Sequence, residues 1–242
     1  MATIFKSFLN NDVATTRTLL HEAVPITGTI PSGTYTAEAN IKNYAHGMFQ
    51  SVFDYPFLSS SANHIFDVTV GYHSTSPLSQ SSPNDYAQQG KKINIYNQMA
   101  QLLVGHDETG AIRKFDADGD LSGGTKIDAA IFVNFARLLG KDELKKGSFS
   151  MTFMTGVNPP HRNGTADTIA INDSGSNTDY RVNSPAGEYG ILYVNRGGAD
   201  VDVHKAGLIY YQAGVAVITS SLFQGGFAVG GVHASLSQFG PP

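Results

Sequence analysis

Apolar and polar residues alternate over several short stretches of this chain, which is the period of a β-strand with one buried face. The clearest alternation runs through residues 148–153, whose two sets of side chains are expected to face a core and solvent, respectively. The core set is Phe149, Met151 and Phe153, and the solvent set is Ser148, Ser150 and Thr152. Further strands are expected at 3–8, 65–72, 111–115, 131–135, 168–171, 190–195, 201–204, 206–211 and 215–220.

Three other stretches place apolar residues three to four positions apart, which is typical of an amphipathic helix. The most regular is 85–104, and a second is expected over 13–23. A third is expected over 38–53, although Gly47 weakens it. A short charged turn of helix is expected at 138–146. Stretches rich in Gly, Ser, Asn or Asp predict loops at 74–84, 116–124, 156–180 and 225–231.

Together these elements predict a mainly β protein with a few helices, in the α+β class. The strands are short and separated by turn signals, which favours an antiparallel sheet or sandwich with long loops. A chain of 242 residues fits one structural domain spanning 1–242 with extended termini, and a boundary is possible near 106–125.

Composition narrows the function classes. Only 15 % of the residues are charged, the net charge is −4, and no basic stripe runs through the sequence, so nucleic acid is not an expected partner. The chain has no cysteine, which excludes disulfides and thiolate chemistry. The longest apolar run, 207–223, is interrupted by Gln212 and is too short to predict a membrane span. No signal peptide is evident, so folding in the cytoplasm is expected.

One acidic turn has carboxylates at alternate positions, as calcium-binding loops do. Asp116, Asp118 and Asp120 are therefore weak candidates for metal ligands. The EF-hand pattern has Gly at its sixth position and Glu at its twelfth, where this chain has Leu121 and Ile127. These two mismatches favour a plain acidic hairpin turn, and no metal is expected there.

A second polar set is Asp200, Asp202 and His204, which would share one face of a strand. The simpler interpretation is a half-buried strand with Val201 and Val203 inward and a solvated polar face. The sequence contains no nucleophile elbow, phosphate-binding loop or dinucleotide fingerprint. No catalytic residue, no cofactor-binding residue and no cofactor is therefore predicted, and the protein is not expected to be an enzyme.

Four stretches resemble virion structural proteins of T4-like, contractile-tailed bacteriophages, especially those that infect marine cyanobacteria. They are residues 51–67, 95–101, 135–153 and 184–190. The resemblance implies a structural role in the tail or baseplate of a virion assembled in the host cytoplasm. It brings no catalytic residues.

The sequence and the resemblance together predict a non-enzymatic assembly protein that contacts copies of itself and other virion proteins. Candidate contact segments are 1–8, 74–84, 156–180 and 225–242, with Phe5, Phe8, Gly225, Phe227 and Phe239 as candidate interface residues. One alternative is a carbohydrate-recognising module on a phage fibre, for which exposed aromatic residues in a groove would discriminate. Another is a neck, collar or capsid-associated protein. A hydrolase would require a cleft with converging carboxylates.

Overall fold

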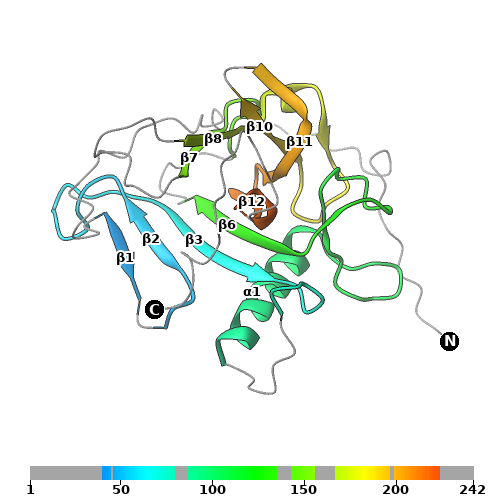
Figure 1. Cartoon of the computed structure of the whole chain (residues 1–242), viewed down its shortest axis with the longest axis horizontal. Coiled ribbons are helices and arrows are strands. Elements are labelled where there is room, and N and C mark those ends of the chain that lie inside the picture. Colours follow the sequence, from blue (N-terminus) through cyan, green and yellow to red (C-terminus); the bar gives the residue numbers. More distant parts are fainter. Residues whose placement is uncertain are drawn as a thin grey trace.

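A large antiparallel β-sheet dominates the protein. In a computed structural model, the described residues form one sheet of ten strands, one long helix packed against it and a separate two-stranded hairpin (Figure 1). The mainly β, antiparallel architecture expected from the sequence is therefore confirmed. The structure describes residues 40–44, 46–79, 87–135, 143–155, 167–196 and 199–223.

The strand order is β1-β2-β3-β6-β12-β11-β10-β8-β7, with β9 paired to β10 outside this path. The strands are β1 (Ile41–Asn43), β2 (Gln50–Phe53), β3 (His64–Tyr72), β6 (Ala129–Phe135), β7 (Ser150–Thr155), β8 (Asp167–Asn172), β9 (Tyr180–Arg181), β10 (Tyr189–Arg196), β11 (Ala199–Tyr210) and β12 (Val215–Thr219). The other elements are the hairpin strands β4 (Phe115–Asp116) and β5 (Lys126–Ile127), helix α1 (Ala87–Leu103), and the 3-10 helices η3 (Ser174–Asn177) and η4 (Ser220–Phe223).

The central strands are buried on both faces, which explains their nearly continuous apolar sequences. In β6, Ile131 and Val133 face one core, whereas Ala130 and Phe132 face the other. The neighbouring strand β12 is divided in the same way, with Ile218 in the first core. Each face of the sheet therefore requires its own cover.

The first core is covered by the sheet itself. Phe149, directly before β7, places its ring 5.8 Å from that of Phe135 in β6. Because β6 and β7 are several strands apart in the sheet order, this contact requires the sheet to curl over its own face. Figure 1 shows β7 and β8 above β6 and β3, which fits this curl.

The second core is covered by α1 and the β4–β5 hairpin. A Cβ atom at Gly71 in β3 would lie 2.8 Å from the backbone nitrogen of Tyr96 and 3.0 Å from the backbone oxygen of Lys92, so glycine permits the close approach of the helix. Tyr96 is fully buried, and its hydroxyl donates a 2.7 Å hydrogen bond to the Ile127 carbonyl. This bond ties the hairpin to α1.

Several local expectations are confirmed. Phe149 is 2 % exposed, whereas Ser150 and Thr152 are exposed, so the predicted register of this segment is correct. The stretches 201–204 and 206–211 are a single strand, because Lys205 pairs with Tyr193 in β10. The other confirmed elements are the strands expected at 65–72, 131–135, 168–171, 190–195 and 215–220, and the helix expected at 85–104.

The helix expected at 38–53 is wrong. This stretch is the β1–β2 hairpin, in which Ile41 pairs with Val52 and Gly47 takes a left-handed φ of 63° in the connecting turn. Its apolar residues fit the spacing of a helix, but glycine at position 47 would destabilise a helix, whereas it adopts the positive φ of this turn without steric strain. The turn therefore overrides the apolar spacing.

Two further expectations need correction. The strand expected at 111–115 is wrong, because only Phe115 lies in a strand, β4, while Ile112 makes an isolated bridge with His106. In the described part of the expected helical turn at 138–146, residues 143–146 are not helical. The strand expected at 3–8, the helix at 13–23 and the loop at 225–231 lie outside the described residues. Across the described ranges, no helix combines the length and apolarity that a bilayer crossing requires.

The close approach at Gly71 makes a testable prediction. Gly71→Ala is expected to lower the free energy of unfolding by about 1–3 kcal/mol, because the new methyl group would meet helix backbone that cannot move aside independently. Gly90→Ala in α1 is the control: its Cβ would meet nothing within 4 Å, and it should raise stability by up to about 1 kcal/mol. Urea unfolding measures both changes. Equal shifts would contradict the packing described here.

The curl of the sheet makes a second prediction. Phe149→Ala is expected to lower the free energy of unfolding by about 3–5 kcal/mol, since the ring is buried between the two ends of the sheet. Ser150→Ala, at the neighbouring exposed position, should change it by less than about 0.5 kcal/mol. Denaturant unfolding of both variants tests the difference, and a larger effect of Ser150→Ala would place the wrong face inward.

Candidate functional site

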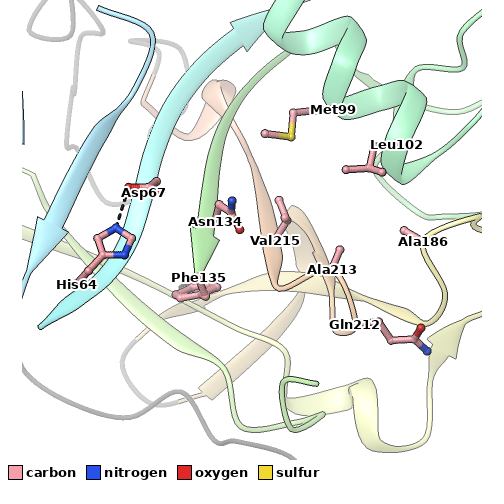
Figure 2. A pocket seen from close by; sticks show the side chains of 10 residues that line it. All are labelled: His64, Asp67, Met99, Leu102, Asn134, Phe135, Ala186, Gln212, Ala213 and Val215. Carbon is pink, nitrogen blue, oxygen red and sulfur yellow. Dashed lines mark hydrogen bonds and ion pairs between the residues drawn. The ribbon is translucent and has the colours of Figure 1, made fainter. Parts of the chain in front are cut away.

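A surface pocket of about 740 Å³ lies where the end of α1 meets the sheet. Met99 and Leu102 of α1 form one wall, and residues of β3, β6 and the β11–β12 turn form the others (Figure 2). Leu102 is 61 % exposed at the rim. The full lining is His64, Asp67, Met99, Leu102, Asn134, Phe135, Ala186, Gln212, Ala213 and Val215.

A polar row crosses the sheet at one side of this pocket. Strand register places Ser51 opposite Asp67, and Asp67 opposite Asn134. The Ser51 hydroxyl donates a 2.5 Å hydrogen bond to Asp67 Oδ1, and His64 Nε2 lies 2.8 Å from the same oxygen. The register shifts by one residue between β2 and β3, with Ile65 as the extra residue, and this bulge lets His64 and Asp67 meet although they are three positions apart.

These three side chains do not form a nucleophilic triad. In a triad, the serine donates to one imidazole nitrogen and the carboxylate holds the other. Here both Ser51 and His64 contact a single oxygen of Asp67, so the imidazole is not positioned to take the proton of the hydroxyl. The arrangement instead satisfies the buried hydroxyl of Ser51, which is 4 % exposed.

The acidic turn between β4 and β5 is a second candidate. The structure brings together carboxylate oxygens of Asp116, Asp118 and Asp120, each within 4.8 Å of the others. Asp116 is buried, Asp118 is partly buried and Asp120 is exposed, so the group runs from the interior to solvent. The carbonyl of Gly119 accepts a 3.1 Å hydrogen bond from Asn183 Nδ2 and lies 3.0 Å from the hydroxyl of Tyr189, which anchors the turn to β10 and the segment before it.

Two ammonium groups partly balance this charge. Lys126 Nζ lies 2.9 Å from Asp116 Oδ2, and Lys205 Nζ lies 3.7 Å from Asp118 Oδ2. Burial raises the pKa of Asp116 above its usual value, against the opposing effect of Lys126. The pKa of Asp120 is lowered, chiefly by the hydrogen bond from the Ser122 backbone N–H.

A third candidate is the apolar surface at the β1–β2 end of the sheet. The side chain of Leu58 is 89 % exposed in the β2–β3 loop, and Tyr55 in the same loop is 48 % exposed. The loop is closed by Asp54 and Asn63, whose backbone and side chains share three hydrogen bonds of 2.6–3.1 Å. Leu58 is therefore displayed on an ordered loop.

The β1–β2 turn adds a cluster of rings at the same edge of the sheet. Tyr44, His46 and Phe49 have ring centroids 4.9–5.2 Å apart, and Met48 and Phe49 are each 37 % exposed. The ammonium of Lys42 lies 5.1 Å from the centroid of the Tyr44 ring. This turn and the 54–63 loop lie at opposite ends of β2.

The candidate residues predicted from the sequence have different outcomes. The three carboxylates of the acidic turn do come together. The second polar set lies in β11, but the side chains of Asp200 and Asp202 are outside the described residues, so its grouping stays a prediction. The interface candidates Phe5, Phe8, Gly225, Phe227 and Phe239 also lie outside them.

Sequence reasoning missed the His64–Asp67 contact and the exposed loop at Leu58. The first depends on a bulge that changes which residues share a face, and no residue type signals that bulge. The second had a partial signal, because Asp54 and Asn63 flank a stretch rich in Pro and Ser, which favours a closed loop. Exposure of Leu58 itself is set by tertiary packing.

Comparisons with known proteins add no identification. No family model matches the chain, and searches of the curated proteins and of the solved structures find no match.

The polar row makes a prediction about stability. Asp67→Ala is expected to lower the free energy of unfolding by about 1–3 kcal/mol, because the buried Ser51 hydroxyl loses its carboxylate acceptor. His64→Ala removes a partly exposed pair with Asp67 and an edge-on contact with the Phe53 ring, and should cost about 1 kcal/mol or less. Denaturant unfolding near neutral pH compares the two. A larger loss in His64→Ala would show that the Ser51–Asp67 hydrogen bond contributes little to stability.

Proposed function

We propose that this protein is a non-enzymatic structural protein of a contractile-tailed phage virion, in its tail or baseplate, and that it binds neighbours through the β1–β2 end of its sheet. The observation that carries the proposal is Leu58, which is 89 % exposed on an ordered loop. Exposed apolar surface gathered in one loop, here from Leu58 and Tyr55, is of the kind found at contacts between proteins.

The loop is suited to binding because it is already ordered. Three hydrogen bonds between Asp54 and Asn63 close it, and the backbone N–H of Ser59 donates to the Pro56 carbonyl within it. The loop would therefore lose little conformational entropy when a partner covers Leu58. Tyr55 beside it supplies an aromatic ring of the kind that is enriched in interface centres.

The edge of the sheet supports the same surface. In the described part of the chain, β1 has β2 on one side and no strand on the other. An edge strand can accept a further strand from a neighbour, with backbone hydrogen bonds supplying affinity. Repeated contact between copies of one chain is the usual basis of symmetric assemblies.

The sequence resemblance to phage virion proteins gives this surface its biological setting. Low overall charge suits a protein whose surface lies largely against neighbours, since such copies repel one another weakly. The carbohydrate-binding alternative has less support, because the pocket in Figure 2 contains Phe135 and His64 but no Tyr or Trp platform.

A pair of loop variants tests the proposal. Leu58→Asp is expected to weaken association roughly ten- to hundredfold, the effect of losing one buried Leu contact, and so to reduce incorporation into virions. Ser60→Asp adds the same charge to an exposed position of the same loop and should incorporate almost normally. Quantitative mass spectrometry of purified virions measures incorporation, and thermal unfolding confirms that both variants fold.

Two results would contradict the proposal. Absence of the unmodified protein from purified virions would exclude the structural role itself. Normal incorporation of Leu58→Asp would leave the role standing but exclude this loop as the contact.

A further inference from the structure

We propose that the β4–β5 turn is a calcium-binding site formed by Asp116, Asp118 and Asp120 together with the backbone carbonyl of Ser122. This proposal reverses the plain acidic turn that the sequence spacing favoured. It concerns a different part of the molecule from the β1–β2 end and does not depend on the proposed function.

The strongest observation is an unsatisfied oxygen. The side chain of Asp116 is fully buried, and its Oδ1 atom has no hydrogen-bond partner. The other oxygen, Oδ2, also accepts no hydrogen bond, but it forms an ion pair with Lys126 Nζ at 2.9 Å. A buried carboxylate oxygen without a donor is costly, so its environment calls for a cation or another strong partner.

The unsatisfied oxygen points into a space that other oxygens share. A Cβ atom placed on Gly124 would lie 3.7 Å from Asp116 Oδ1, 3.3 Å from Asp118 Oδ2 and 3.6 Å from the Ser122 carbonyl oxygen. The Ser122 carbonyl is not part of the acidic cluster, yet it converges on the same space. Glycine at 124 keeps this space open, because the Cβ atom of any other residue would enter it.

These oxygens match the ligand positions of a calcium loop. If Asp116 is the first position, Asp118 and Asp120 are the third and fifth, and Ser122 is the seventh, which contributes its backbone carbonyl. The sixth position usually needs Gly because the chain turns sharply there. Leu121 takes that conformation, with φ 63°, so the first sequence mismatch does not prevent the loop from forming.

The second mismatch sets the expected strength. Ile127 stands at the twelfth position, is buried, and supplies no bidentate carboxylate. Water can complete the shell on the exposed side, next to Asp120. We therefore expect a dissociation constant on the order of 10⁻⁴–10⁻³ M, at the weak end of calcium loops. Calcium is favoured over magnesium, because magnesium demands a strict octahedral shell and dehydrates reluctantly.

The electrostatics also favour a divalent ion. Three carboxylates share the site with two ammonium groups. The ammonium of Lys205 lies 3.7 Å from Asp118 Oδ2, and the Lys205 side chain is 37 % exposed. Lys205 is thus free to withdraw into solvent when a cation binds. Lys126 Nζ pairs with Asp116 Oδ2, whereas Oδ1 is the oxygen next to Gly124, so the ammonium and the ion use different oxygens.

Calcium titration of the full chain tests the site. Protein freed of metal by a chelator is titrated with calcium chloride by isothermal calorimetry, and its Tm is measured with and without about 10 mM calcium. At roughly ten- to hundredfold excess over Kd, the Tm should rise by about 3–10 °C. Magnesium chloride at the same concentration should give a smaller rise.

Three variants locate the effect. Asp118→Asn should abolish both the heat of binding and the Tm rise, and Asp120→Asn, at an exposed position, covers the case in which the first variant fails to fold. Asp179→Asn removes the same charge from a side chain that is 61 % exposed outside the loop and should retain both signals. Lys126→Met should strengthen calcium binding several-fold, because it removes a nearby positive charge.

The outcomes separate the alternatives. A Tm rise lost in Asp118→Asn or Asp120→Asn but kept in Asp179→Asn supports the site. No heat and no Tm rise in the unmodified protein would overturn it, and would leave Lys126 and Lys205 as the cations that balance this loop. An equal rise in all the variants would also overturn it, as calcium would then act elsewhere.

Discussion

The structure depends on burying both faces of its central strands. Strands β6, β12, β11 and β10 are apolar toward both cores, so neither face tolerates water. One face is covered when the sheet curls and brings β7 and β8 over β3 and β6. The other is closed by α1 and the β4–β5 hairpin, which is separate from the large sheet. The positions of the pocket and of the acidic turn follow from that second cover.

The same constraint explains why β1 and β2 form the exposed end. These strands lie beyond the reach of both covers, and only Ser51 and Val52 are buried among the residues of the two strands. With little surface to bury, the hairpin and the 54–63 loop contribute less to the core than the central strands do. Apolar side chains there, such as Leu58, are left exposed by the fold.

The sequence predicts the parts of this fold that periodicity controls. The alternation through Phe149 and the β-branched run of β6 placed their strands correctly, because each side chain's face follows from its parity along the strand. Periodicity failed where few residues decide the matter. In the β1–β2 hairpin, the apolar residues have helical spacing, but Gly47 takes a left-handed φ that a turn requires and a helix does not allow. The curl of the sheet depends on contacts between distant segments, which no local pattern encodes.

The candidate sites show the same division. The spacing of Asp116, Asp118 and Asp120 was visible in the sequence. Whether their oxygens converge depends on burial and on the backbone conformation of Leu121. That left-handed conformation is unfavourable for leucine and is imposed by the tertiary structure. The anchoring of Gly119 by Asn183 and Tyr189 was invisible, because these residues are more than sixty positions away. That anchor matters for an ion: a loop already held against β10 loses little freedom when its oxygens close on a cation. An ion bound there would in turn fix the hairpin that covers the second core, and so would stabilise the sheet against unfolding. This effect would arise several strands away from the surface proposed to bind neighbours.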